Sequence, residues 1–184
     1  MLEAYKMRPA PYPDGGRARK IVRGSAEGNM KILIVDDSRD ATALISSLLR
    51  AAGYYDLETA DSGEQALAIL EGQNAQLGEP MIDLILMDIL MPGMDGIEAV
   101  ARIKDASAFC DIPIIMISAM ADLNSLESAF EAGAMDFIHK PVNRVELRAR
   151  VRSALRLKEE MDLRKARERE LAELNARLEE LLGV

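Results

Sequence analysis

The chain has 184 residues, of which 49% are hydrophobic but only 4% aromatic, so its core must be built from aliphatic side chains. A net charge of −8 at pH 7 argues against general electrostatic binding to nucleic acid or to an anionic membrane. The single cysteine excludes an intrachain disulfide framework, and no apolar run approaches the roughly 20 residues of a membrane-spanning helix. We therefore expect a cytoplasmic protein without direct nucleic-acid or membrane partners.

Residues 1–29 differ in composition from the rest of the chain. They hold six Lys or Arg against three Asp or Glu, together with three prolines and four glycines. Such a segment buries too little apolar surface to offset the conformational entropy lost on ordering. We predict a flexible basic leader over 1–29, and Met30 is an alternative start just before the first strand.

From residue 30 onward, short apolar runs alternate with segments of helical periodicity. Strands are predicted at 31–35, 57–60, 82–88, 112–118 and 135–140. Helices are predicted at 41–53, 61–70, 97–103 and 122–133, with a loop at 73–80 and a fifth helix after Pro141. Ser62 is expected to cap the second helix, with Gln65 three residues on. This alternation predicts an α/β fold with a doubly wound, five-stranded parallel sheet.

The C-terminal part of the chain predicts one long helix. No Gly or Pro occurs from Val142 to Leu182, so the fifth helix can run on out of the domain. Over 158–184 it carries leucines spaced 3, 4 and 3 residues apart, which is the spacing of a coiled-coil seam. These leucines are Leu171, Leu174, Leu178 and Leu181. We favour a parallel dimer over a single solvated helix, because a long helix without core support is marginal alone.

Polar residues of unusual chemistry stand at the carboxyl ends of the predicted strands. They are Asp36 and Asp37, Asp88, Ser118 and Lys140. A parallel sheet gathers such ends at one edge, where ligands of these folds bind. Three neighbouring carboxylates repel one another unless a cation is present, and a hard divalent ion such as Mg²⁺ fits oxygen ligands. Carboxylates, metal, ammonium and hydroxyl together predict a phosphoryl-transfer pocket in which an aspartate oxygen attacks in line.

Four motifs resemble one known family, the receiver domains of two-component response regulators. They are "VDDS" at 35–38, "LMDILMPGMDG" at 86–96, "ISA" at 117–119 and "HKP" at 139–141. They stand in the family's order and spacing, and the resemblance covers residues 30–157. It implies a flavodoxin-like receiver fold and, for this chain, a C-terminal signalling helix.

The resemblance also implies roles for single residues. Asp88 would be the phosphoacceptor, and Mg²⁺ would be bound by Asp36, Asp37, Asp88 and the backbone carbonyl of Leu90. Lys140 would contact the phosphoryl group and Ser118 would turn to hydrogen-bond it. Phe137 matches the family's switch aromatic, Pro141 follows a peptide bond that is usually cis, and Met120 occupies a position that tunes dephosphorylation. Pro92 and Gly93 are expected to be structural, in a tight turn beside Asp88.

The implied partners follow from the family. A sensor histidine kinase would be the phosphodonor, and the face of the fourth helix, fifth strand and fifth helix would form a homodimer together with the coiled coil. A downstream effector domain or protein, such as a nucleotide cyclase or a phosphatase, would receive the signal. The chain would not be an enzyme beyond self-phosphorylation and autodephosphorylation.

Two alternatives remain open from the residues. One is a phosphate-independent dimeric scaffold of the same fold. The other is a phosphohydrolase of the haloacid dehalogenase kind, but that class needs an acid two residues after the nucleophile, where this chain has Leu90. A dinucleotide-binding fold is disfavoured because no Gly-x-Gly-x-x-Gly follows the first strand.

Overall fold

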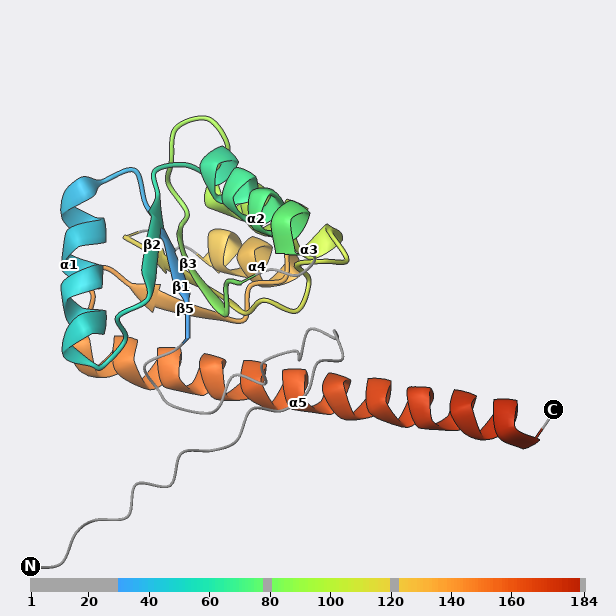
Figure 1. The fold of residues 1–184 in the computed structure, drawn as a ribbon. Coiled ribbons are helices and arrows are strands. Elements are labelled where there is room, and N and C mark those ends of the chain that lie inside the picture. The colour runs from blue at the N-terminus through green and yellow to red at the C-terminus, as the bar shows by residue number, and fades with distance from the viewer. Residues whose placement is uncertain (1–29, 78–80, 120–122, 183–184) are drawn as a thin grey trace, which may run out of the picture.

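A computed structural model describes residues 30–77, 81–119 and 123–182, so the predicted leader over 1–29 lies outside the described residues. Five strands alternate with five helices along this part of the chain, and Figure 1 shows how these elements are arranged in space. The strands are β1 (Ile32–Val35), β2 (Leu57–Ala60), β3 (Leu84–Asp88), β4 (Ile114–Ser118) and β5 (Asp136–His139). The helices are α1 (Arg39–Ala51), α2 (Gly63–Leu77), α3 (Gly96–Asp105), α4 (Leu123–Glu131) and α5 (Arg144–Leu182).

The strands form one parallel sheet in the order β2-β1-β3-β4-β5. Its register pairs Val35 with Met87 and Ser118 with His139, so neighbouring strands end at nearly the same level. The strand order reverses beside β1 and β3, and this switch point is where ligands bind in doubly wound sheets. The predicted fold class is confirmed.

Two hydrophobic cores cover the two faces of the sheet. On one face α2, α3 and α4 pack through small and aliphatic residues such as Leu70, Val100 and Ala129. On the other face α1 and α5 pack through Leu49, Val151 and their neighbours (Figure 1). Alternate strand residues point into the two cores, which explains why the strands are apolar nearly throughout. The sheet is therefore held rigidly, and its edges can present polar side chains in fixed positions.

Helix α2 extends further than predicted at its C-terminal end, whereas its start has the predicted Ser62 contact. The segment 73–80 was expected to be a loop, but the helix continues to Leu77. The side chain of Gln73 explains the extension. Its Nε2 donates to Glu58 Oε2 at 3.1 Å, and its Oε1 accepts from the backbone amide of Met81 at 3.2 Å. At the start, Ser62 Oγ accepts from the Gln65 amide as predicted, whereas the Gln65 side chain accepts from Asp61.

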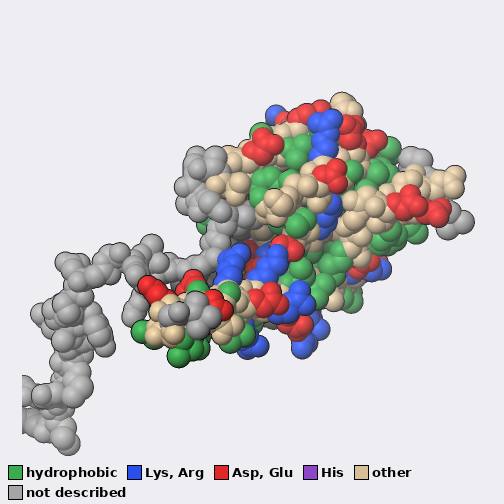
Figure 2. All heavy atoms as spheres, turned by 90° about the vertical axis from the view of Figure 1, so that its right-hand side faces the viewer, with side chains coloured by type: hydrophobic (Ala, Val, Ile, Leu, Met, Phe, Trp, Pro, Cys, Tyr) green, Lys and Arg blue, Asp and Glu red, His purple; other side chains and the backbone are tan. Residues whose placement is uncertain are grey.

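Helix α5 is a single helix of 39 residues. Its first turns are buried against the sheet through Leu147, Val151, Ala154 and Leu155. Further along, Lys165 forms an ion pair with Asp111, which precedes β4. Beyond this contact the helix projects from the domain, with charged side chains of both signs around it (Figure 2). No helix in the described ranges is both long and apolar enough to cross a membrane.

Candidate functional site

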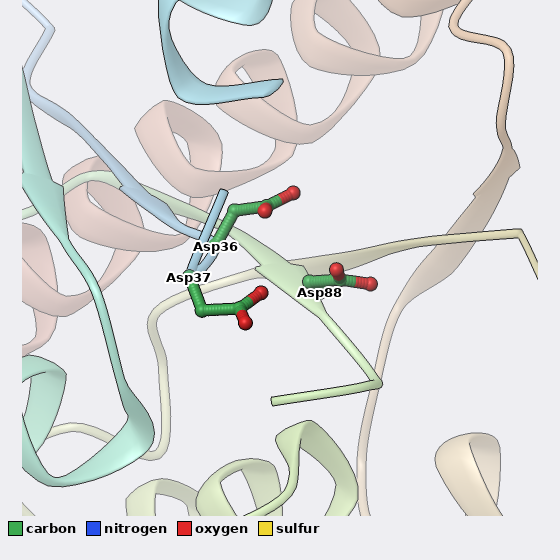
Figure 3. Close-up of side chains that lie close together, drawn as sticks. All are labelled: Asp36, Asp37 and Asp88. Atoms are coloured by element: carbon green, nitrogen blue, oxygen red, sulfur yellow. The ribbon is translucent and has the colours of Figure 1, made fainter. Parts of the chain in front are cut away.

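Three aspartates meet where β1 and β3 end. Asp36 and Asp37 follow β1, and Asp88 is the last residue of β3. One carboxylate oxygen from each lies within 4.8 Å of the others, and Figure 3 shows the three side chains side by side. Asp36 is 2% exposed and Asp88 is 6% exposed, whereas Asp37 faces solvent. The predicted gathering of these acids at one sheet edge is therefore present.

The turn after β1 fixes Asp36. The backbone amide of Ser38 donates to Asp36 Oδ1 at 2.9 Å, and Ser38 in turn caps α1 by accepting from the Ala41 amide. The chain thus passes from strand to helix within three residues, with the Asp36 carboxylate held by the turn itself. Asp37, between them, is left at the solvent side of the site.

Lys140 brings a positive charge to the two buried carboxylates. Its Nζ lies 2.7 Å from Asp36 Oδ2 and 2.7 Å from Asp88 Oδ2. The Lys140 backbone amide donates to the Ser118 carbonyl at 2.8 Å, which ties the end of β5 to the end of β4. The Lys140–Pro141 peptide bond is cis, as the family pattern predicted. Four strand ends therefore contribute to one site.

Burial and charge oppose each other in this cluster. Burial raises the pKa of the Asp88 carboxyl above its ordinary value, and the nearby Asp36 adds to this, although hydrogen bonding to Lys140 acts in the opposite direction. Burial is the largest single influence and would lower the pKa of Lys140, but its hydrogen bonds to Asp36 and Asp88, together with the charges of these two carboxylates, outweigh burial and raise it. The ammonium is therefore the countercharge that keeps two adjacent acids buried.

The loop between β3 and α3 follows Asp88 and contains Leu90, whose side chain is 53% exposed. Gly93, which was expected to be structural, adopts a φ of +82°, a conformation that favours glycine. Gly96 was not singled out from the sequence, yet a Cβ there would lie 1.9 Å from the Asp88 carbonyl oxygen. Only glycine fits at this close approach of α3 to the end of β3.

The other residues implied by the family pattern surround this cluster. Ser118 ends β4 and is fully buried. Phe137 in β5 is half-buried and packs against the core formed with α2, α3 and α4. Its register partner is Met116, two residues before Ser118. Pro92 lies on the exposed side of the β3–α3 loop, and Met120 is outside the described residues.

The donor set fits a hard divalent cation. Three carboxylates supply oxygen ligands close together, and two of them are largely buried. Magnesium usually keeps several waters and takes one or two carboxylates, and the exposed Asp37 leaves room for solvent on one side. The cluster could therefore hold Mg²⁺ next to the Lys140 ammonium.

Comparison with known proteins agrees with this geometry. The family model of the response regulator receiver domain matches residues 32–152. The chain therefore belongs to the response regulator receiver family of two-component signalling. Members of this family are signalling modules, in general without catalytic activity of their own, and they bind Mg²⁺ through acidic residues.

Relatives and solved structures show how far the likeness extends. The response regulator PleD of Caulobacter vibrioides is 37% identical over 138 residues, which cover 75% of this chain and 29% of PleD. The chain matches half or less of the length of its first curated relatives. A CheY-like receiver domain protein from Methanospirillum hungatei has a TM-score of 0.63 at 28% identity, covering 72% of this chain and 98% of that one. A CheX-CheY-BeF3-Mg complex from Borrelia burgdorferi has a TM-score of 0.60 at 31% identity, covering 67% and 87%.

Proposed function

We propose that this chain accepts a phosphoryl group on Asp88 in a Mg²⁺-dependent reaction. The observation that carries the proposal is the contact of Lys140 Nζ with both Asp36 and Asp88 at 2.7 Å, in a chain of the receiver family. An Oδ atom of Asp88 would attack the phosphorus of the donor, and the bond from phosphorus to the donor's leaving group would break. The product is an aspartyl phosphate, and a sensor histidine kinase is the proposed donor.

The site residues divide the remaining tasks. Asp36, Asp37, Asp88 and the backbone carbonyl of Leu90 would hold Mg²⁺, which when bound neutralises charge on the phosphoryl oxygens. Lys140 would leave its carboxylate partners in part and bind the phosphoryl group. A structural relative was solved with BeF3 and Mg, which supports this assignment.

The phosphoryl group would then bias a two-state element. It adds a charge of about −1.5 to −2 at pH 7. Ser118, at the end of β4, would hydrogen-bond the new oxygens, and Phe137, which pairs beside Met116 in the sheet, would move into the space released. The face of α4, β5 and α5 would change shape as a result.

Helix α5 offers a continuous path from this face to a dimer. Arg150, which donates to Asp136 of β5 at 2.5 Å, occupies the same heptad position as Leu157, Leu171 and Leu178, because the spacings are multiples of seven. These leucines are exposed. A second copy that pairs at the α4–β5–α5 face could therefore also pair along the C-terminal leucines, in the same heptad register.

The middle of this seam is polar. Glu160, Arg164 and Arg167 occupy its core positions between Leu157 and Leu171. Charged residues at such positions weaken a coiled coil. The helix alone should therefore pair weakly, which would make dimerisation dependent on the phosphorylated receiver face.

We propose that the dimer signals in the cytoplasm to an effector domain or protein, such as a nucleotide cyclase or a phosphatase.

Phosphorylation is tested with acetyl phosphate and MgCl₂, followed by mass spectrometry of the labelled peptide. We expect one phosphoryl group on Asp88, no labelling of Asp88→Asn, and normal labelling of the control Asp105→Asn. Labelling should also require the metal and stop in EDTA. Absence of labelling in the folded wild type would favour a phosphate-independent scaffold, and turnover of a small phosphomonoester would favour a phosphohydrolase.

Dimerisation is tested by sedimentation with and without beryllofluoride, a mimic of the phosphoryl group. We expect the mimic to strengthen the dimer. Equal dimer affinity in both conditions would refute phosphorylation-controlled dimerisation, while leaving the phosphorylation of Asp88 itself untouched.

A further inference from the structure

The loop of residues 89–95 between β3 and α3 is fixed at both ends. The Gly96 amide donates to the Ile89 carbonyl at 2.9 Å, and Gly96 packs directly on the Asp88 carbonyl. Asp95 caps α3 by accepting from the Glu98 amide at 2.8 Å. These contacts hold the two ends of the loop but not its middle.

The middle of the loop is held by the first turn of α2. The Met94 amide donates to Glu64 Oε1 at 3.0 Å, across 30 residues of sequence. The same oxygen would lie 3.0 Å from a Cβ on Gly93, so the carboxylate sits directly against the turn. This hydrogen bond ties the loop to α2 and gives the part-buried Met94 amide its partner, which would be costly to leave unpaired.

The Met94 side chain is held by the same helix. Met94 is buried, and a Cβ on Gly63 would lie 3.0 Å from its sulfur and 3.0 Å from the Ala99 Cβ. Helix α2 therefore fixes Met94 by its backbone through Glu64 and by its side chain through the close approach at Gly63. Leu90, four residues earlier in the same loop, has an exposed side chain that adds no anchorage of its own, although its neighbours Ile89 and Met91 are buried in the core.

We infer that Glu64 is a positioning residue for the metal site and acts through Met94 and the loop on the backbone carbonyl of Leu90. This inference rests on the proposed function, in which that carbonyl is a ligand of Mg²⁺. Magnesium requires oxygen ligands at near-ideal octahedral positions. A loop that is free to shift should therefore bind Mg²⁺ less tightly, even though all three aspartates remain.

The test is calorimetric titration of the phosphate-free protein with MgCl₂. Glu64→Ala should weaken Mg²⁺ affinity by about tenfold, the scale seen when partners that orient metal ligands are removed. Glu64→Asp keeps the charge but is one methylene too short, and it should weaken affinity similarly. Glu64→Gln keeps an acceptor at the same reach and should restore affinity to within about twofold of the wild type. Glu71→Ala, on the same helix, is the matched control and should change nothing.

Hydrogen exchange of the Met94 amide in Mg²⁺-free protein gives a second readout. Its exchange should accelerate in Glu64→Ala and Glu64→Asp but stay slow in Glu64→Gln. Wild-type affinity in folded Glu64→Ala, or in Glu64→Asp if the alanine variant does not fold, would overturn the inference. Equal weakening in Glu64→Gln and Glu64→Ala would assign the effect to charge and would overturn it as well. No saturable Mg²⁺ binding by the wild type would instead refute the proposed function.

Discussion

The ammonium Nζ of Lys140 lies 2.7 Å from Oδ2 of Asp88, although 52 residues separate them in the chain. The same ammonium contacts Asp36, so one cation at the end of β5 neutralises acids from the ends of β1 and β3. Two buried carboxylates therefore lie against one ammonium group. A phosphoryl group would also attract this ammonium.

Lys140→Met should destabilise the protein at pH 7 without Mg²⁺. The change leaves Asp36 and Asp88 buried without this countercharge, and we expect a loss of about 1–3 kcal/mol in the free energy of unfolding, since Lys140 is partly exposed. Urea unfolding measures the loss, and MgCl₂ should restore part of it. Arg102→Met removes an exposed pair with Glu98 and should cost little. Equal stability of Lys140→Met and wild type would contradict this interpretation.

Gly96→Ala should destabilise the fold far more than an ordinary glycine substitution. The added Cβ would lie 1.9 Å from the Asp88 carbonyl, so α3 or the end of β3 must move. We expect a loss of about 3 kcal/mol in unfolding free energy. Gly72→Ala in α2 is the matched control, because its Cβ would meet nothing within 4 Å. That control should gain about 0.5–1 kcal/mol, and similar effects of the two changes would be the contrary result.

Lys104 should make the free energy of unfolding depend on pH in the alkaline range. Burial lowers its pKa below the ordinary 10.5, although Cys110 and Asp111 partly oppose this, and its Nζ donates to the carbonyls of Cys110 and Ile112. Between the lowered pKa and 10.5 the unfolded chain binds more protons at this residue, so its contribution to stability rises with pH there. The stability of wild type minus that of Lys104→Met, from urea unfolding at pH 7 to 10.5, should increase with pH. A constant or falling difference in stability would show that burial does not lower the pKa of Lys104.

If the proposed dimer forms in the presence of beryllofluoride, Leu174→Glu should weaken it. Leu174 is exposed on α5 and lies in the leucine seam, where a glutamate in each copy would meet its counterpart. Ala176→Glu adds the same charge on the opposite side of the helix and should leave the dimer intact. Sedimentation at several concentrations distinguishes the two. If both substitutions acted alike, the seam would not be the dimer contact.

The sequence was sufficient for features that depend on local pattern and strand order. The strand-end acids and Lys140 could be placed together because parallel strands end at one sheet edge. Contacts between segments far apart in the chain were not predictable. Neither the hydrogen bond of Met94 to Glu64 nor the approach of Gly96 to Asp88 leaves a periodic pattern in the sequence. The continuation of α2 to Leu77 was missed for the same reason, since Gln73 contacts both β2 and the segment before β3.

Helix α5 packs in the core at its start and extends away from the domain towards Leu182. A small tilt of the packed part would therefore move the far end by a larger distance, as in a lever. Val151 anchors it on the sheet, and Lys165 holds it at Asp111. From Lys165 to Leu182 the helix extends about 25 Å, so a tilt of about 10° would displace its tip by about 4 Å. Movements too small to alter the packing around the sheet would thus become large at the tip.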